Sequence, residues 1–392
     1  MKFIHTSDWH IGKIVNEFHM TEDQEIALNE LFNIIEEEKP NALVIAGDLY
    51  DRSVAPVEAI ELLNKVLNKI IIDLNTPVIA IAGNHDSGER LEFAKALVRN
   101  KGLYIEGIFN GEINKVTLED EYGPVNFYLI PYVDPPVVRE IYGYETIKDH
   151  DKAMKAMIER IKEKMNKSER NVVIAHGYVT YMTDKVEEKG GLSTSDSERP
   201  LSIGGSELIN AGYFEDFNYT ALGHLHGPQR VGSEKIRYAG SLLKYSFSEV
   251  KQRKGVTIVN MDKYGDIDIE LRNIPMRRDF RIIKGELNSL IDPSVYREGN
   301  REDYIKVILT DEGEVLEPMA KLRAIYPNIM ELSREVTKGN EETKVSKERN
   351  YKNKSKMDLF KDFYMDITGR ECDDKRQQVM EKIIEEVEKG GE

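Results

Sequence analysis

ALVIAGDLYD (residues 42–51) and VIAIAGNHD (residues 78–86) follow the same pattern. In each segment a short apolar run leads directly into glycine and then into side chains that bind metals or phosphates. Uninterrupted apolar runs of this length are typical of buried strands in a parallel sheet. Residues 21–38 and 57–74 have helical spacing, and one of these segments precedes each run. Strands that alternate with helices in this way predict a parallel sheet with right-handed crossovers.

Three further apolar runs end in the same kind of polar motif: residues 3–4, 172–175 and 219–222. Residues 124–130 and 235–260 contain strand-type segments without long helices between all of them, which predicts a second sheet packed on the first. We therefore expect an α/β protein whose main unit is a layered α/β/β/α sandwich.

The chain of 392 residues is too long for one ordinary core, so we expect several domains. The sandwich should occupy residues 1–278. Residues 279–332 repeat the alternation of strand and helix on a small scale, which predicts a compact α+β capping domain. Residues 333–356 are mostly charged and polar and predict a linker. Residues 357–392 carry two apolar stripes at helical spacing, which predicts a C-terminal helical hairpin.

Composition limits the class of protein. The single cysteine, Cys372, excludes an intrachain disulfide and a thiolate metal site, and it favours a reducing compartment. The first residues reach charged Asp8 without an apolar stretch long enough for a signal peptide or a membrane span, so we expect a cytoplasmic protein. The formal net charge of -15 argues against bulk attraction to nucleic acid, so any DNA contact must be local.

Seven side chains in the strand-terminal motifs are candidate metal ligands: Asp8, His10, Asp48, Asn84, His176, His224 and His226. The carboxyl ends of strands converge at one edge of an open sheet, so distance in sequence does not separate these residues. Carboxylate, imidazole and amide donors without sulfur suit Mn, Fe or Zn, and manganese is the metal that we expect first. Seven donors are too many for one ion and fit two ions that share a bridging carboxylate. Asp48, on the central strand, is the expected bridge.

Two divalent ions about 3.5–4 Å apart neutralise the attacking and leaving oxygens of a phosphoryl displacement. The predicted reaction is therefore phosphoester hydrolysis. His85 directly follows the ligand Asn84, so we expect its ring to act on the phosphate or the leaving oxygen as a donor or general acid. Taken singly, Asp-x-His and Gly-Asp motifs are more often turns or surface pairs. Five of the eight histidines fall in these motifs, however, which favours one shared site.

Together, the motifs Asp8-x-His10, Gly47-Asp48-x-x-Asp51, Gly83-Asn84-His85-Asp86, His176 and Gly223-His224-x-His226 resemble the signature of calcineurin-like metallophosphoesterases. Their order, spacing and flanking residues resemble SbcD-type nuclease subunits over almost the whole chain. The resemblance implies that Asp8, His10, Asp48 and His226 hold one ion, that Asp48, Asn84, His176 and His224 hold the other, and that His85 is the catalytic histidine. Archaeal and eukaryotic relatives carry a substrate-orienting histidine at the position of Asp51, so we expect Asp51 to orient His85 instead.

The same resemblance implies a DNA nuclease of repair and recombination, with ATP-dependent double-strand exonuclease and single-strand or hairpin endonuclease activity. It also implies that the hairpin docks on the coiled-coil base of an SMC-like ATPase, SbcC, although these helices could instead pack on their own domain. Relatives form homodimers. Candidate dimer faces are Leu62, Leu63 and Val66, or Phe93 and Leu97, and each could equally belong to the core.

Two segments are candidates for DNA contact. Residues 227–256 carry seven Lys or Arg against two Glu, a net +5, directly after the last metal motif. Residues 185–205 form a Gly- and Ser-rich stretch that could shape substrate access.

Two other functions stay open. One is a phosphatase or small-molecule phosphodiesterase that uses the same metal pair, because the signature alone does not select the substrate. Arg52 favours it, but Ser53 and Asp86 stand where protein phosphatases typically have Gly and Glu. The other is a noncatalytic scaffold that acts through its hairpin, and the intact ligand set counts against it.

Overall fold

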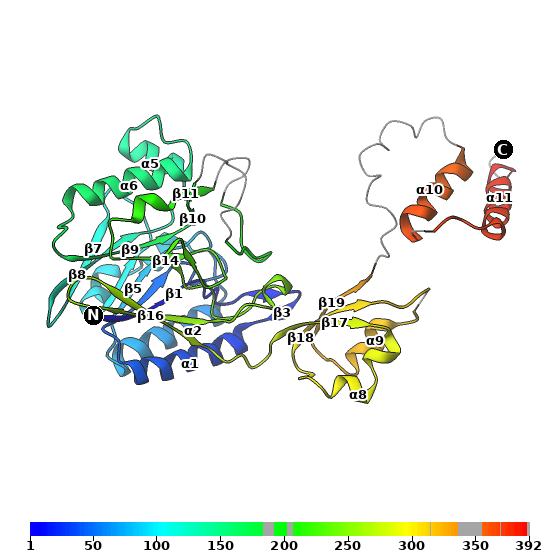
Figure 1. The fold of residues 1–392 in the computed structure, drawn as a ribbon, viewed down its shortest axis with the longest axis horizontal. Coiled ribbons are helices and arrows are strands. Elements are labelled where there is room, and N and C mark those ends of the chain that lie inside the picture. The colour runs from blue at the N-terminus through cyan, green and yellow to red at the C-terminus, as the bar shows by residue number, and fades with distance from the viewer. Residues whose placement is uncertain (183–191, 202–206, 314, 336–354, 369, 390–392) are drawn as a thin grey trace.

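The computed structural model describes residues 1–182, 192–201, 207–313, 315–335, 355–368 and 370–389. Its largest part is built from two six-stranded sheets with helices on their outer faces (Figure 1). This arrangement is the α/β/β/α sandwich that the sequence predicts. A small three-stranded sheet and a pair of helices follow it along the chain.

The first sheet contains the parallel strands predicted from the first three motifs. Its order is β16-β15-β1-β4-β5-β6, with β1 (Lys2–Thr6), β4 (Ala42–Ala46), β5 (Val78–Ile81), β6 (Leu103–Glu106), β15 (Gly255–Met261) and β16 (Ile267–Asn273). The helices α1 (Thr21–Glu38) and α2 (Val57–Asn68) pack against this sheet, and a wider helical turn, η1 (Lys69–Asp73), extends α2 as predicted. Every residue of β4 and β5 is buried, which explains their uninterrupted apolar runs.

The second sheet contains the strands of the fourth and fifth motifs. Its order is β13-β14-β12-β9-β8-β7, with β7 (Asn114–Asp120), β8 (Gly123–Ile130), β9 (Arg170–His176), β12 (Tyr219–Gly223), β13 (Gln229–Val231) and β14 (Ser233–Tyr238). The helices α5 (Pro135–Tyr142) and α6 (His150–Lys164) pack on its outer face, and a separate apolar cluster fills the space between the two sheets.

One strand assignment from the sequence is wrong. We predict residues 235–260 in the second sheet, and β14 lies there, but β15 pairs antiparallel with β1 in the first sheet. The reason is that β15 is apolar on both faces. Ile258 joins the core under α1 while Val259 faces the second sheet, so the strand fits beside β1.

The remaining elements of the sandwich are short: β2 (Ile14–Val15), β3 (Phe18–His19), α3 (Gly88–Leu91), α4 (Lys95–Val98), η2 (Arg99–Lys101), β10 (Tyr178–Thr180), β11 (Leu208–Asn210), η3 (Ala211–Phe214) and η4 (Phe247–Glu249). Leu62, Leu63 and Val66 of α2 are buried in the core, so this candidate dimer face is wrong. Phe93 and Leu97 are exposed.

The three-stranded sheet has its own apolar core. It consists of the parallel strands β17 (Phe280–Gly285), β18 (Tyr304–Leu309) and β19 (Ile329–Arg334), with the helices α7 (Leu287–Leu290), α8 (Pro293–Tyr296) and α9 (Pro318–Arg323). The strand β19 extends two residues into the predicted linker, because Arg334 still pairs with Leu309 of β18. Most of the predicted linker, residues 336–354, lies outside the described residues.

The last two helices are α10 (Lys356–Thr368) and α11 (Asp374–Lys389), where the sequence predicts a hairpin. They contact each other and lie apart from the sandwich (Figure 1). Phe363, Ile367, Val379 and Ile383 are apolar and exposed on them. Among the described residues, no helix combines the length and the apolar character needed to cross a membrane.

Candidate metal centre

The strand-terminal motifs of both sheets meet at one edge of the sandwich. The Asp8 amide donates to Gly47 O (3.0 Å) and the His10 amide donates to Asp48 O (2.9 Å), so the loops after β1 and β4 are joined through their main chains. Trp9, between the two donors, is buried in the core and anchors the first loop.

The backbone of this edge adopts unusual conformations. Asp8 (φ 53°), His10 (φ 47°), Asp48 (φ 55°) and His224 (φ 106°) all have positive φ angles. Residues other than glycine rarely adopt such angles, and those that do collect at functional sites because the surrounding structure must hold them there. Four of the seven candidate ligands share this feature.

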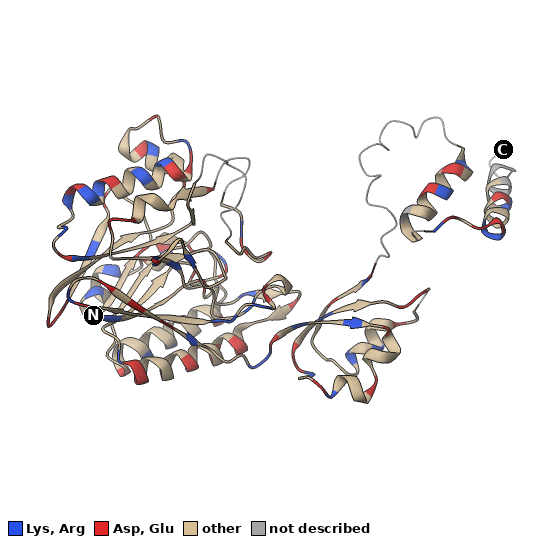
Figure 2. Cartoon of the chain, in the orientation of Figure 1, with Lys and Arg blue, Asp and Glu red and all other residues tan. Residues whose placement is uncertain are grey.

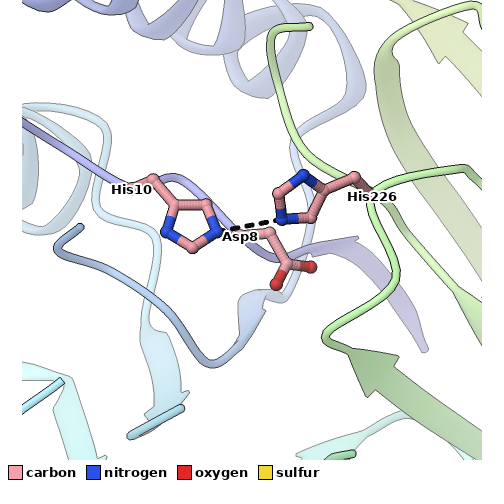
Figure 3. A group of neighbouring side chains, drawn as sticks. All are labelled: Asp8, His10 and His226. Atoms are coloured by element: carbon pink, nitrogen blue, oxygen red, sulfur yellow. Dashed lines mark hydrogen bonds between the residues drawn. The ribbon is translucent and has the colours of Figure 1, made fainter. Parts of the chain in front are cut away.

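Asp8, His10 and His226 form the first group of donors (Figure 3). One donor atom from each lies within 4.8 Å of the other two, and all three residues are buried. The Nε2 atoms of His10 and His226 are only 3.0 Å apart. The group therefore brings two imidazole nitrogens and a carboxylate oxygen to one point.

Asp8, Asp48 and His176 form the second group. His176 Nε2 lies 3.4 Å from Asp48 Oδ2 and 2.9 Å from Asn84 Oδ1, which places Asn84 beside this group. Asp48 Oδ2 also lies 3.7 Å from His10 Nε2. Asp48 therefore lies between the histidines of the two groups, and Asp8 belongs to both.

His224 lies beside these groups without belonging to either. Its ring centroid is 5.6 Å from that of His176, and its amide donates to Asp8 Oδ1 (3.0 Å). The structure thus brings all seven predicted ligands to one edge of the sandwich, with His224 contacting Asp8 through its main chain.

His85 forms a third group with His10 and Asp51. Its Nδ1 lies 2.8 Å from the main-chain oxygen of Asp51, and its amide donates to Asp48 Oδ1 (2.9 Å). The carboxylate of Asp51 instead accepts from Lys13 Nζ (2.6 Å). Any orienting effect of Asp51 on His85 therefore acts through a carbonyl, which every residue type supplies.

Burial and mutual attraction set the charges. Burial raises the pKa of Asp8 to about 7. Burial also disfavours the charged forms of Asp48 and His176, but their attraction holds the pKa of Asp48 well below its usual value and raises the pKa of His176 to about 9. Burial lowers the pKa values of His10 and His226, which keeps these rings in the neutral form that binds metals.

Glycines allow the close approach of the loops around His176. A Cβ atom on Gly47 would lie 2.4 Å from His176 Nδ1, and one on Gly83 would lie 2.1 Å from Asp48 Oδ1. A Cβ atom on Gly223 would lie 1.9 Å from Ala46 O. Each of these three glycines is therefore required because a side chain would clash with a candidate ligand or with the main chain beside it.

The residues fit a pair of divalent cations. Carboxylates, imidazoles and one amide oxygen supply only oxygen and nitrogen donors, as Mn, Fe and Zn sites require. His10 Nδ1 is buried and has no hydrogen-bond partner among the described residues, and its carboxylate neighbour, Asp51 Oδ1, is 3.7 Å away. If His10 Nδ1 carries the ring proton, the lone pair of His10 Nε2 faces His226 Nε2. A cation between these two nitrogens relieves the repulsion between their lone pairs.

The predicted basic surface over residues 227–256 is only partly exposed. Arg237, Lys244 and Lys254 are buried, and Lys244 and Lys254 pair with Asp279 (2.8 Å) and Glu249 (2.6 Å). Arg230 and Arg237 both pair with Glu234. Charges of both signs are similarly interspersed along α6 (Figure 2). Four of the seven cations therefore make local ion pairs, and Arg230, Lys235, Lys251 and Arg253 are exposed.

Four residues around the site were not predicted from the sequence: Lys13, Gln24, Ser197 and Glu249. Gln24 Nε2 donates to His10 O (2.8 Å), and Ser197 Oγ contacts His226 Nδ1 (2.7 Å). Ser197 falls in the stretch 185–205 that we predict to shape access, and only residues 192–201 of that stretch are described. No motif or periodicity marks the other three.

Comparison with known proteins defines the class. Residues 1–228, more than half of the chain, match the calcineurin-like phosphoesterase family, and the chain belongs to this family of metal-dependent hydrolases. Residues 276–368 match the SbcD C-terminal family, described as the type 5 capsule protein repressor C-terminal domain. The two matches together identify an SbcD-type nuclease subunit.

Two solved structures are similar over 70% of this chain. The protein TT1561 of Thermus thermophilus has 12% identity and a TM-score of 0.40, with 99% of that chain covered. A dimetal phosphatase from Danio rerio has 11% identity and a TM-score of 0.41, with 97% of that chain covered.

Proposed function

We propose that the protein is a two-metal DNA phosphodiesterase that uses Mn²⁺ and works in the cytoplasm in DNA repair and recombination. Its activities are ATP-dependent exonuclease action on double strands and endonuclease action on single strands and hairpins, as the nuclease subunit of a complex with SbcC. The observation that carries the proposal is the convergence of seven donor residues and His85 at one edge of the sandwich.

The position of Asp48 supports the division of the ligands. Its Oδ2 atom lies between His10 Nε2 (3.7 Å) and His176 Nε2 (3.4 Å). Residues Asp8, His10, Asp48 and His226 would hold one ion, and residues Asp48, Asn84, His176 and His224 would hold the other. Bound divalent cations supply Lewis-acid stabilisation of the charge that develops on phosphoryl oxygens.

In this proposal, His85 transfers a proton. Its Nδ1 bonds the main-chain oxygen of Asp51, which leaves Nε2 for the substrate. The protonated ring donates from Nε2 to the leaving oxygen, and the fixed Nδ1 contact holds the ring in the required orientation. Asp51 is a positioning residue in this scheme.

The C-terminal segments supply the partner contacts of the proposal. The sandwich spans residues 1–278, the capping domain begins at residue 279 and includes all of β19, and the hairpin of residues 357–392 docks on the coiled-coil base of SbcC. The exposed apolar side chains of α10 and α11 support docking, because such side chains are favoured in helix interfaces. The exposed Phe93 and Leu97 support a homodimer contact near α4.

Replacing His85 by Gln tests the catalytic assignment. We expect cleavage of linear duplex DNA with Mn²⁺ to fall by about 10²–10⁴-fold, because proton transfer to the leaving group is lost. The Mn²⁺ content, measured by elemental analysis, should stay unchanged. His19→Gln, at an exposed site on β3, is the matched control and should cut normally. Full cleavage by His85→Gln would refute the role of His85.

A substrate panel separates the nuclease from a phosphatase of the same family. Linear duplex DNA, DNA hairpins and phosphopeptides are compared with the wild-type protein in Mn²⁺, with and without the ATPase partner and ATP. The proposal expects DNA cleavage that falls by about 10²–10⁴-fold in His85→Gln. Turnover of phosphopeptides without DNA cleavage would assign the same metal pair to a phosphatase.

A further inference from the structure

The ring nitrogen of His226 that faces away from His10 has a buried partner. His226 Nδ1 lies 2.7 Å from Ser197 Oγ, and Ser197 Oγ donates in turn to Glu249 Oε1. Glu249 Oε1 is itself 3.6 Å from His226 Nδ1. Along the chain, Ser197 is 29 residues from His226 and 52 residues from Glu249, so three separate segments meet behind one candidate ligand.

Lys254 closes this arrangement into a ring of contacts. Its Nζ lies 2.6 Å from Glu249 Oε2 and donates to the main-chain oxygen of His226 (2.8 Å). The side chains of Glu249 and Lys254 are both 0% exposed. A buried ion pair loses hydration at both ends and is therefore weak evidence of a purely stabilising role. Here the pair contacts both the ring side and the main chain of the same histidine.

The hydrogen-bond directions select one form of the ring. A carboxylate only accepts hydrogen bonds, and Glu249 Oε1 accepts from both Ser195 Oγ (2.6 Å) and Ser197 Oγ. Ser197 has a single hydroxyl proton, so once this proton is donated to Glu249, the oxygen can only accept from His226 Nδ1. The proton of the neutral ring therefore lies on Nδ1, and the lone pair on Nε2 points toward His10 and Asp8.

We propose that Ser197, Glu249 and Lys254 are positioning residues that hold His226 as the Nδ1–H tautomer and aim its Nε2 at a divalent cation. This inference rests on the proposed function of the site as a metal centre. Partners of this kind fix ring orientation and raise the basicity of a ligating histidine, and their loss typically lowers metal affinity 10–100-fold. Lys254 acts by fixing the carboxylate and the main chain of His226.

The experiment measures Mn²⁺ binding to the full chain by electron paramagnetic resonance titration, with ¹⁵N spectra of labelled histidines to read the tautomer. We expect Ser197→Ala and Glu249→Gln to weaken one of the two bound cations by about 10–100-fold while the other changes by less than about threefold. The His226 signal should lose its Nδ1–H character in both variants.

Ser195→Ala is the matched control, because Ser195 Oγ contacts Glu249 Oε1 (2.6 Å) and Ser197 Oγ (2.9 Å) in the same segment but does not contact the His226 ring. Ser195→Ala should bind both cations within about threefold of wild type. Ser197→Thr should also keep its affinity for both cations, because threonine retains the hydroxyl. Equal weakening by Ser195→Ala and Ser197→Ala would overturn the proposal, since the loss would then follow the segment and not the hydroxyl.

Glu249→Gln leaves Lys254 buried without its partner, which can prevent folding. The double variant Glu249→Gln with Lys254→Met removes both charges and should show the same selective loss of one cation. Unchanged affinity for both cations in Ser197→Ala and in this double variant would refute the positioning role while leaving the metal centre intact. Failure of the wild-type protein to bind any Mn²⁺ would instead refute the proposed function itself.

Discussion

The two halves of the candidate metal centre are supported in different ways. Asp48, Asn84 and His176, which we term the main-chain half, are enclosed by backbone. His176 Nδ1 lies 2.9 Å from Ala46 O, and glycines in three motifs leave no space for a Cβ atom. The positions of these three side chains are therefore set once the strands have paired.

His10 and His226, the side-chain half, are instead supported by side chains from other segments. Gln24 Nε2 donates to His10 O (2.8 Å), and Ser197 contacts the His226 ring. The difference teaches that the sandwich fold alone defines only part of the site. The orientation of His10 and His226 depends on side chains from other segments, and a different loop conformation would move these side chains away.

Residues next to these supports along the chain contact the three-stranded sheet. Asp23, next to Gln24 on α1, accepts from Tyr304 Oη (2.5 Å). Phe247, two residues before Glu249, packs against Phe280 with tilted rings whose centroids are 5.2 Å apart. A displacement of the small sheet should therefore reach His10 and His226 before it reaches the main-chain half.

The largest expected effect comes from Gly83→Ala in the main-chain half. The new Cβ would lie 2.1 Å from Asp48 Oδ1 and 2.5 Å from the Asp48 amide, and neither backbone nor a buried carboxylate can move away easily. We expect a loss of about 3 kcal/mol or more in the free energy of unfolding, measured by denaturant titration, and loss of Mn²⁺ binding.

Gly212→Ala provides the comparison, because its nearest neighbour would be Asn210 Oδ1 at 3.3 Å. This variant should unfold within about 0.5 kcal/mol of wild type. Normal Mn²⁺ binding by Gly83→Ala would show that the backbone around Asp48 yields, and the contrast between the two halves would then be wrong.

The main-chain half is also the part that sequence predicts best. Uninterrupted apolar runs such as residues 42–46 specify buried strands, and strand ends fix where Asp48 and His176 must lie. Their ligand chemistry follows from residue type. Local sequence and main-chain geometry therefore agree, which is why Asp48, Asn84 and His176 reach the predicted edge.

The side-chain half depends on contacts that leave no local signal. In the sequence, Lys254 is one of seven cations in a basic segment, but in the structure it is buried against Glu249. In the sequence, Gln24 is an ordinary polar residue in the first turn of a helix, but in the structure its side chain contacts the main chain of His10. Charge and helical spacing describe neighbours along the chain, whereas these partners come from tertiary packing.

Gln24→Ala should have the next largest effect, on the side-chain half. Its amide group bonds the Gly12 amide (3.0 Å), His10 O (2.8 Å) and Tyr245 Oη (3.0 Å), and truncation removes all three contacts. His10 O then keeps only the Lys13 amide (3.0 Å), and Tyr245 Oη keeps Trp9 O (2.6 Å). We expect a loss of about 2 kcal/mol in the free energy of unfolding and weaker binding of one cation only. Denaturant titration and Mn²⁺ titration measure the two effects.

The exposed Gln378→Ala on α11 is the matched control and should change neither quantity. Equal weakening of both cations by Gln24→Ala would contradict the division of the site, because the support of His10 would then extend to the main-chain half.

The smallest effect is expected from Asp120→Asn, which weakens β9 at the end opposite His176. The Arg170 guanidinium, which donates to Asp120 Oδ2 (2.8 Å), holds the pKa of that carboxyl well below its usual value. A depressed carboxyl pKa stabilises the fold fully above the unfolded value of about 3.9, and the contribution is lost as the pH falls toward the folded value. The variant should therefore lose about 1.5 kcal/mol at pH 7 and progressively less below pH 4.

This variant separates general stability from local support. Its Mn²⁺ affinity at pH 7 should equal that of wild type for both cations. Asp120 contacts Arg170, six residues along β9 from His176, and the Met1 amino group, seven residues from Asp8. The exposed Asp268→Asn should show no stability difference at either pH. If Asp120→Asn lowered affinity in proportion to stability, the selective losses expected from Gln24→Ala would need to be corrected for global unfolding before they could be assigned to one half of the site.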